Sequence, residues 1–321
     1  MSNPILDVRN VEVFNNGSLS NEDYHAREGI SSTGVLTIAS DCPAVYKYAE
    51  RKPSKAMDFG TASHALMLEP EMFAAQFVRD ISKNDYDAIL STQAEVKAWL
   101  KDAGIKGYST KPIAELYEMV FASDPDVKIL ATEIEKHHKK FDGATFIKAD
   151  DYDTLLKMHN AIFAYPAYAK VLRESSVECS VFCEIKIEGC DDWIKVKVRP
   201  DIITKDLLVP DYKTTRDVRP EEFGRLAYYS GYWTRQAFVC DILSAVYKKD
   251  FKPSLLAQGS SSPYIPQMYM LNSDQVGHGR SEYHESLITY SNCLKTDVWP
   301  AYSDGPIELE TPGYLNKQLF D

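Results

Sequence analysis

The sequence predicts an α/β (α+β) fold in which a helical N-terminal region precedes a β-sheet with flanking helices. Residues 72–175 contain few glycines and mix polar with apolar positions as helices do. Runs rich in β-branched residues follow between 177 and 215, and a helix is predicted from Pro220. With 321 residues, 44% of them hydrophobic, the chain is long enough for one large domain. We predict an N-terminal arm over residues 1–22 and a single domain over 23–321, helical to about residue 175.

The first predicted elements are the arm and three short helices. Residues 1–22 have mixed polarity and an Asn-Asn-Gly turn signal, typical of a loose arm or a small hairpin. A serine or threonine at 31–33 can cap a helix through residue 39, and Pro43 suits the first turn of the next. A third helix is predicted at about 61–68, with His64 inside it. A lone histidine on such an apolar helix is more often a core residue than a ligand.

Residues 177–187 alternate as a strand, with Glu178 on one face and cysteines on the other. A turn signal at Gly189 follows, and the next strand starts after it. Three of the six cysteines fall within twelve residues here, so an iron–sulfur or zinc site is an alternative. The chain has no C-x-x-C pair in this stretch, and the other cysteines lie far away. Buried thiols are therefore favoured.

The stretch 196–215 carries the strongest candidate for chemistry. Asp201 follows a proline within the first β-rich run, and Asp211 and Lys213 lie in the second. Side chains alternate along a strand, so Asp211 and Lys213 share a face, roughly 7 Å apart. If the two runs pair as a hairpin, Asp201 is brought beside Asp211. Two carboxylates could then hold Mg²⁺, and the ammonium could steady an attacking water or developing charge, as phosphodiester hydrolysis requires.

Two of these signals also have simpler explanations. A charged surface hairpin with an ordinary Asp–Lys ion pair accounts for Asp201, Asp211 and Lys213 without any catalysis. The basic cluster at 136–140, Lys-His-His-Lys-Lys, contains two adjacent histidines. Adjacent residues point about 100° apart on a helix, so a solvated basic face is favoured over a metal site. That face could still contact phosphate.

The C-terminal third is predicted to return to helices. One long helix extends from Pro220 to about Tyr247, with acidic residues in its first turn. Tyr232 and Gln236 are four residues apart and share one of its faces. A strand at 264–271 and a helix at 282–293 complete the prediction.

The net charge of −11 restricts how this protein could bind nucleic acid. Proteins that hold DNA by its phosphates usually present a basic face, so any DNA path should be confined rather than spread over the surface. No apolar run approaches the roughly 20 residues of a membrane span, and the N-terminus lacks the pattern of a secretion signal. We expect a cytoplasmic protein that does not contact membranes.

Seven sequence blocks, spread over roughly residues 24–302, occur in an order found in one known family. The blocks are GISSTGVLTIASDCPAVYKY, MDFGTASHALMLEP, VECSVF, VRPDII, PDYKTT, AYYSGYWTRQAF and TDVWPAY. Together they resemble the nuclease domain of the exodeoxyribonuclease VIII (RecE-type) family, within the PD-(D/E)xK nuclease superfamily. The resemblance implies a restriction-endonuclease-like core with a mixed central β-sheet flanked by helices. It also implies a Mg²⁺-dependent 5′→3′ exonuclease acting on double-stranded DNA ends, with Mn²⁺ able to substitute.

The resemblance assigns roles to individual residues. It implies that Asp201 and Asp211 are metal ligands and that Lys213 is the catalytic lysine. His64 falls on the family's active-site histidine, which favours a metal-site role over core packing. Glu178 falls on the acid that opens the strand before the Pro-Asp, and would contact the metal or the DNA end.

One position departs from the family pattern. Gln236 matches the family's glutamine on the helix after the lysine, but the tyrosine expected four residues later is Cys240. A one-residue slip would place Arg235 at the glutamine position and Val239 at the tyrosine position. The role of Gln236 stays open between these alignments.

The family context also implies partners. Its enzymes, usually encoded by phages or prophages, prepare single strands for a single-strand annealing recombinase, and the resemblance points to a homo-oligomeric ring, a tetramer. Two alternatives remain: a relative that cuts single strands or acts as an endonuclease, and a non-catalytic module that binds DNA ends or a recombinase. The intact Asp201, Asp211 and Lys213 favour an enzyme. An iron–sulfur nuclease is disfavoured by the cysteine spacing.

Overall fold

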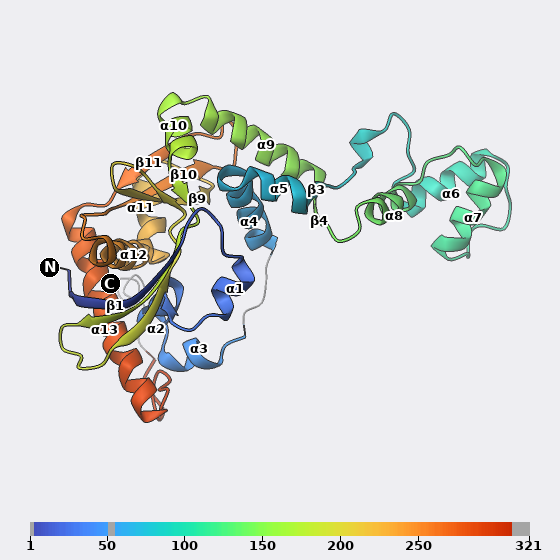
Figure 1. The fold of residues 1–321 in the computed structure, drawn as a ribbon. Coiled ribbons are helices and arrows are strands. Elements are labelled where there is room, and N and C mark those ends of the chain that lie inside the picture. The colour runs from blue at the N-terminus through green and yellow to red at the C-terminus, as the bar shows by residue number, and fades with distance from the viewer. Residues whose placement is uncertain (1–2, 51–54, 310–321) are drawn as a thin grey trace, which may run out of the picture. The chain divides into compact units, whose positions relative to one another are not determined.

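The computed structural model describes residues 3–50 and 55–309, which fold into two compact units (Figure 1). The first unit comprises residues 1–53, 170–258 and 266–321, and the second comprises residues 54–169 and 259–265. Both lie largely within the region for which the sequence predicted a single domain. The ends of the predicted arm and of the predicted domain, residues 1–2 and 310–321, lie outside the described residues.

The larger sheet of the first unit has four strands in the order β1-β6-β7-β2. The strands are β1 (Ile5–Phe14), β2 (Ile30–Ser31), β6 (Ser180–Ile187) and β7 (Ile194–Val198). β6 pairs antiparallel with both β1 and β7, whereas β2 pairs parallel with β7. The sheet is therefore mixed, and the predicted α/β fold class is confirmed.

The segment predicted as a loose arm or a small hairpin contains strand β1, which pairs with β6 along its length. Ile5 lies opposite Ile187 and Phe14 opposite Ser180, with a register shift between Arg9 and Glu12. Within that shift Asn10 takes a positive φ of 51°. A bulge interrupts the two-residue alternation by which a strand is recognised in sequence. This interruption explains why the segment did not read as a strand.

The remaining strands of the first unit carry the predicted chemistry. One sheet has the order β11-β10-β9, and β5 pairs antiparallel with β8. Their bounds are Ser176–Val177 for β5, Ile202–Ile203 for β8, Leu208–Thr215 for β9, Lys252–Gly259 for β10 and Pro266–Met270 for β11. The chain thus leaves β7, forms the short strand β8 and continues into β9.

Of three short helices near the N-terminus, the second and third form as predicted, whereas the first was not predicted. They are α1 (Asn21–Ala26), α2 (Ser32–Ser40) and α3 (Pro43–Tyr48). Ser31 caps α2, because its hydroxyl oxygen accepts a hydrogen bond from the backbone N–H of Gly34 at 3.2 Å. Helix α2 packs with α12 (Tyr232–Tyr247) and α13 (Ser273–Thr296), both visible beside the sheet in Figure 1. Their apolar faces and the strands share one buried core.

The long helix predicted from Pro220 to Tyr247 is wrong as a single element. Two helices, α11 (Pro220–Tyr229) and α12, are separated at Gly231, which has a φ of +64°. That conformation ends a helix and is easy only for glycine. A side chain there would also meet Leu36 Cδ1 at 2.2 Å. The break starts a new helix N-terminus between Tyr229 and Tyr232.

Helix α13 begins earlier than the helix predicted at 282–293. Two glycines before residue 282 made this part of the sequence look unlike a helix. Its start at Ser273 is capped by Asn272 and Gln275, each side chain accepting from the other's backbone N–H. Gly279 lies within the helix where α12 passes close by: a Cβ atom there would be 2.5 Å from the Trp233 carbonyl oxygen. The glycine that weakened the helical pattern is therefore a packing requirement.

The second unit is mainly helical, as the first half of the sequence predicted. Its elements are α4 (Lys55–Leu68), α5 (Pro70–Gln76), β3 (Phe77–Arg79), η1 (Lys83–Asp85), α6 (Gln93–Asp102), α7 (Ile113–Ser123), α8 (Leu130–Lys140), β4 (Thr145–Ile147) and α9 (Ala149–Phe163). Helix α10 (Pro166–Glu174) leads from this unit to the first along the chain. Within the described ranges, every helix is too short or too polar to span a lipid bilayer.

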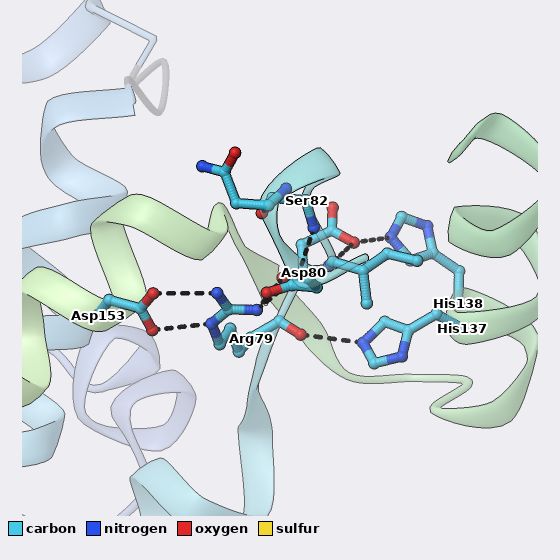
Figure 2. A network of polar contacts seen from close by, with 9 residues as sticks. Arg79, Asp80, Ser82, His137, His138 and Asp153 are labelled. Carbon is cyan, nitrogen blue, oxygen red and sulfur yellow. Dashed lines mark hydrogen bonds and ion pairs between the residues drawn. The ribbon is translucent and has the colours of Figure 1, made fainter. Parts of the chain in front are cut away.

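Both histidines of the basic cluster are used inside the second unit (Figure 2). His137 Nε2 lies 2.9 Å from the carbonyl oxygen of Arg79, and His138 Nε2 lies 3.2 Å from an Asp80 carboxylate oxygen. The Arg79 guanidinium in turn bonds both carboxylate oxygens of Asp153, at 2.7 and 2.9 Å. These contacts attach α8 to β3, so the histidines have a structural role and the metal alternative is not supported.

Candidate active site

Asp201, Asp211 and Lys213 converge as the sequence predicted. The ammonium nitrogen of Lys213 forms an ion pair with Asp211 Oδ2 and lies 4.0 Å from Asp201 Oδ2. Asp201 lies between β7 and β8, and the other two residues lie on β9. Their side chains are 13% exposed for each aspartate and 18% for the lysine. A surface hairpin would leave them in solvent, so this alternative is not supported.

Tyr212 positions the charged residues on both sides of it. Its backbone N–H donates to Asp201 Oδ2 at 2.8 Å, and its carbonyl oxygen accepts from Lys213 Nζ at 3.2 Å. Its own side chain points to the opposite face of β9, where the hydroxyl donates to Gln258 Oε1 of β10 at 2.7 Å. Burial of this tyrosine therefore fixes which face of β9 carries Asp211 and Lys213.

Glu178 lies against the same group, but not within a continuous strand. The predicted strand 177–187 is broken into β5 and β6, and Glu178 between them has a φ of +51°. Its backbone N–H donates to the carbonyl oxygen of Asp201 at 3.1 Å. The side chain is 10% exposed, and its Oε2 atom lies 3.9 Å from the Arg199 Nε atom. A positive φ is unusual for glutamate and marks a locally constrained position.

Three residues around Glu178 gave no functional signal in the sequence. Arg199 donates to Ser180 Oγ at 2.7 Å, and its Cζ lies 4.3 Å from the ring centre of Tyr24. Lys197 is buried and donates to the carbonyl oxygens that end helix α1, including that of Tyr24 at 3.1 Å. Burial raises the pKa of the Tyr24 hydroxyl, while the charge of Arg199 opposes the rise. These contacts come from segments far apart in sequence, so no local pattern could have revealed them.

The set of oxygens and one ammonium suits a hard divalent cation. Carboxylate oxygens are the ligands that Mg²⁺ prefers, and a largely buried position limits competition from water.

The sequence of this chain also matches a known protein family. Residues 43–309 match the family described as "PDDEXK-like domain of unknown function (DUF3799)". The chain belongs to this PDDEXK-like family.

Comparison with solved structures shows the same fold at low sequence identity. The crystal structure of a protein named as a putative exonuclease from Eubacterium rectale aligns with a TM-score of 0.51 and 10% identity, over 94% of this chain and 99% of that one. A protein named SSO0001 aligns with a TM-score of 0.25 and 12% identity, over 75% of this chain and 88% of that one, and supports no argument. No curated protein matches this chain significantly.

In this PDDEXK-like domain, His64 is not one of the core residues of α4. Its neighbours from Ala62 to Leu68 are buried, whereas His64 itself is only half-buried. The apolar cluster beneath the helix includes Ala62, Ala65 and Leu66 but not the histidine. The imidazole therefore lies at the border of the apolar face, which weakens the core-packing explanation.

Gln236, which the sequence connected with the site, is buried in the first turns of α12. Its side-chain oxygen is 3.9 Å from the thiol of Cys240, the residue that replaces the family's tyrosine. Four residues earlier, on the same face of the helix, the ring of Tyr232 lies 5.5 Å from Lys213 Nζ, so the start of α12 does reach the charged group. A catalytic role for Gln236 stays a prediction.

The cysteines are free thiols, as expected from their spacing. Five are buried and Cys190 is half-buried. Burial raises the pKa of Cys183 to about 12, which keeps this thiol protonated at neutral pH. Among residues 3–50 and 55–309, no cysteine belongs to a group of side chains that could hold a metal ion. The iron–sulfur and zinc alternatives are therefore unsupported.

Proposed function

We propose that this protein is a metal-dependent nuclease that hydrolyses DNA phosphodiester bonds. One observation carries the proposal: Asp201, between β7 and β8, converges with Asp211 and Lys213 of β9 in a group whose side chains are 13–18% exposed. Buried carboxylates with a single lysine do not stabilise a fold more than apolar residues would. Such a group is more readily explained by a cation and a phosphate that it binds.

Each residue has a distinct proposed role. Asp201, held by the Tyr212 N–H, and Asp211 are proposed to hold Mg²⁺, for which Mn²⁺ could substitute. When bound, the cation would polarise the phosphate and lower the pKa of a coordinated water. Its charge would also replace Lys213 as the partner of Asp211. The ammonium of Lys213 is then available to orient the attacking water or to stabilise negative charge on the phosphate.

From the resemblance to RecE-type enzymes, we propose metal-site roles for His64 and for Glu178. Replacement of His64 by alanine is expected to lower the specific activity about tenfold or more, since loss of a metal-site residue weakens metal affinity or activity by this order. The melting temperature should stay within a few degrees of that of the unaltered protein, because His64 is not in the apolar cluster. Both quantities would be measured on one preparation over a Mg²⁺ titration.

The matched control for His64 is His159→Ala. His159 is another half-buried histidine of the second unit, on helix α9, and no metal role is proposed for it. Its replacement should leave both specific activity and the Mg²⁺ dependence unchanged. Unchanged specific activity of His64→Ala, with a lowered melting temperature, would instead assign His64 to structure.

The resemblance to RecE-type enzymes supports a narrower proposal. We propose a 5′→3′ exonuclease on linear duplex ends that leaves 3′ single-strand tails for a single-strand annealing recombinase. We also propose that it acts as a homo-oligomeric ring, a tetramer. With a net charge of −11, a monomer should hold DNA weakly. A ring can be acidic outside and retain the duplex by enclosing it.

Linear duplex, covalently closed circular duplex and single strands, each with Mg²⁺ or EDTA, test this function. We expect release of nucleotides from the linear duplex alone, with a 5′ start, and complete loss in EDTA. Light scattering should give several times the monomer mass. Rapid cutting of closed circles or single strands would favour the endonuclease or single-strand alternative. Binding of ends without any cleavage would favour a non-catalytic module, and a monomeric mass would exclude the ring.

A further inference from the structure

Arg235 has a buried polar atom that finds no partner in the described part of the chain. Its Nε atom is shielded from solvent and forms no hydrogen bond, and none of the ion pairs found among these residues involves its guanidinium. Buried polar groups in native proteins are nearly always hydrogen-bonded, and a buried charge without a partner is costly. An exception of this kind requires a reason other than stability.

Other arginines of the first unit show what a structural guanidinium does here. Arg199 uses its nitrogens on Ser180, on Asn21 and on backbone carbonyl oxygens. Arg280 bonds both carboxylate oxygens of Asp241, at 2.8 and 2.7 Å. Arg235 differs from both, because its donors are not used by the protein itself. They remain available to an anion from outside the chain.

The position of Arg235 indicates which anion. It lies in the second turn of α12, three residues after Tyr232 and so on the neighbouring helix surface. The Tyr232 ring is 5.5 Å from Lys213 Nζ. Burial is the main cause that raises the pKa of the Tyr24 hydroxyl, and the charge of Arg235 is among those that oppose the rise, so Arg235 is also within electrostatic range of Tyr24. Arg235 therefore lies close to the turn of α12 that reaches Lys213.

We propose that Arg235 binds a backbone phosphate of the DNA strand beside the metal site; this rests on the nuclease function proposed above. A guanidinium presents two parallel N–H donors that match phosphate oxygens, and it stays charged at any working pH. Lys213, the partner of Asp211, has a different proposed task, at the attacking water or the reacting phosphate. The unpaired arginine thus gives the acidic protein a local cation at the place where the strand must be held.

Arg235→Ala tests the proposal, with Arg225→Ala as the matched control. Arg225 lies ten residues earlier on α11, is 61% exposed, and pairs with Glu221 and Glu222, so the control removes the same charge. Binding of a fluorescent 5′-phosphorylated duplex would be measured with Ca²⁺ in place of Mg²⁺, at several salt concentrations. We expect Arg235→Ala to bind about tenfold more weakly or worse, since bonds to charged groups are the strong ones. The slope of log affinity against log salt should fall by about one.

Two further readouts separate a binding role from a structural one. Arg235→Lys keeps the charge but loses the two parallel N–H donors of the guanidinium. Its affinity for DNA should lie between those of Arg235→Ala and the unaltered protein. The melting temperature of Arg235→Ala should be unchanged or higher, because a buried Nε atom without a hydrogen-bond partner is removed. A clear fall in melting temperature, or affinity and salt slope equal to those of Arg225→Ala, would overturn the inference alone. Absence of any DNA binding by the unaltered protein would overturn the proposed function as well.

Discussion

Replacement of Lys213 by alanine is expected to lower the rate of nucleotide release from linear duplex DNA by about two orders of magnitude or more. The lysine forms an ion pair with Asp211 and lies 4.0 Å from Asp201. Without it, the carboxylates could still bind a metal, but no ammonium would remain to orient water or stabilise the developing charge. Initial rates at saturating Mg²⁺ and saturating DNA measure the effect.

The control for this variant is Lys205→Ala, in the turn between β8 and β9. Lys205 is 75% exposed and pairs with Glu174, 3.2 Å away, so it shares the hairpin but not the site. Its removal should leave the rate unchanged, since exposed ion pairs contribute little. A rate for Lys213→Ala within tenfold of the unaltered protein would contradict the assignment of the lysine. Circular dichroism should show the same fold for both variants.

Replacement of Asp241 by alanine is expected to lower the free energy of unfolding by about 3–5 kcal/mol. This aspartate lies in the core between α12 and α13, with 3% of its surface exposed. It accepts two hydrogen bonds from Arg280 and one, at 2.6 Å, from the Tyr283 hydroxyl. Burial is the main reason that the pKa of Tyr283 is raised, and the bond to Asp241 adds to it. Without Asp241, the Arg280 guanidinium, whose side chain is 23% exposed, loses the counter-charge that it pairs with here.

Equilibrium unfolding in urea measures this effect, with Asp217→Ala for comparison. Asp217 also pairs with an arginine, Arg219, but the Asp217 and Arg219 side chains are 36% and 73% exposed. Its loss should cost no more than about 1 kcal/mol. If Asp241→Ala also lies within about 1 kcal/mol of the unaltered protein, the buried network does not stabilise the fold in the way described.

The sequence was sufficient to predict the central charged group because the pattern is local. Asp211 and Lys213 share a face by strand alternation alone, and the turn at residues 205–206 brings Asp201 back beside them. The helices α2 and α3 were equally local, since their caps and proline lie within a few residues of the apolar positions. Elements with a complete local signal were therefore predictable.

The remaining features depend on contacts between distant segments. Gly231 ends α11 because Leu36 occupies the space of its missing side chain, and Gly279 is required where α13 passes Trp233. Both glycines gave misleading local signals. Glu178 leaves its strand because β5 pairs with β8 while β6 pairs with β1 and β7. Partners this far away in sequence cannot be inferred from spacing.

Tyr212 shows that a catalytic arrangement can depend on a residue with no chemical part in it. Its N–H orients Asp201, its carbonyl receives Lys213, and its hydroxyl is anchored to Gln258 in the protein interior. The orientation of the Asp201 and Lys213 side chains thus depends on Tyr212, an uncharged residue that is 3% exposed. Natural variation at position 258 or 212 could consequently silence the site while every charged residue is retained. For the proposed nuclease, an intact set of acidic residues and lysine is therefore expected to be necessary for activity but not sufficient.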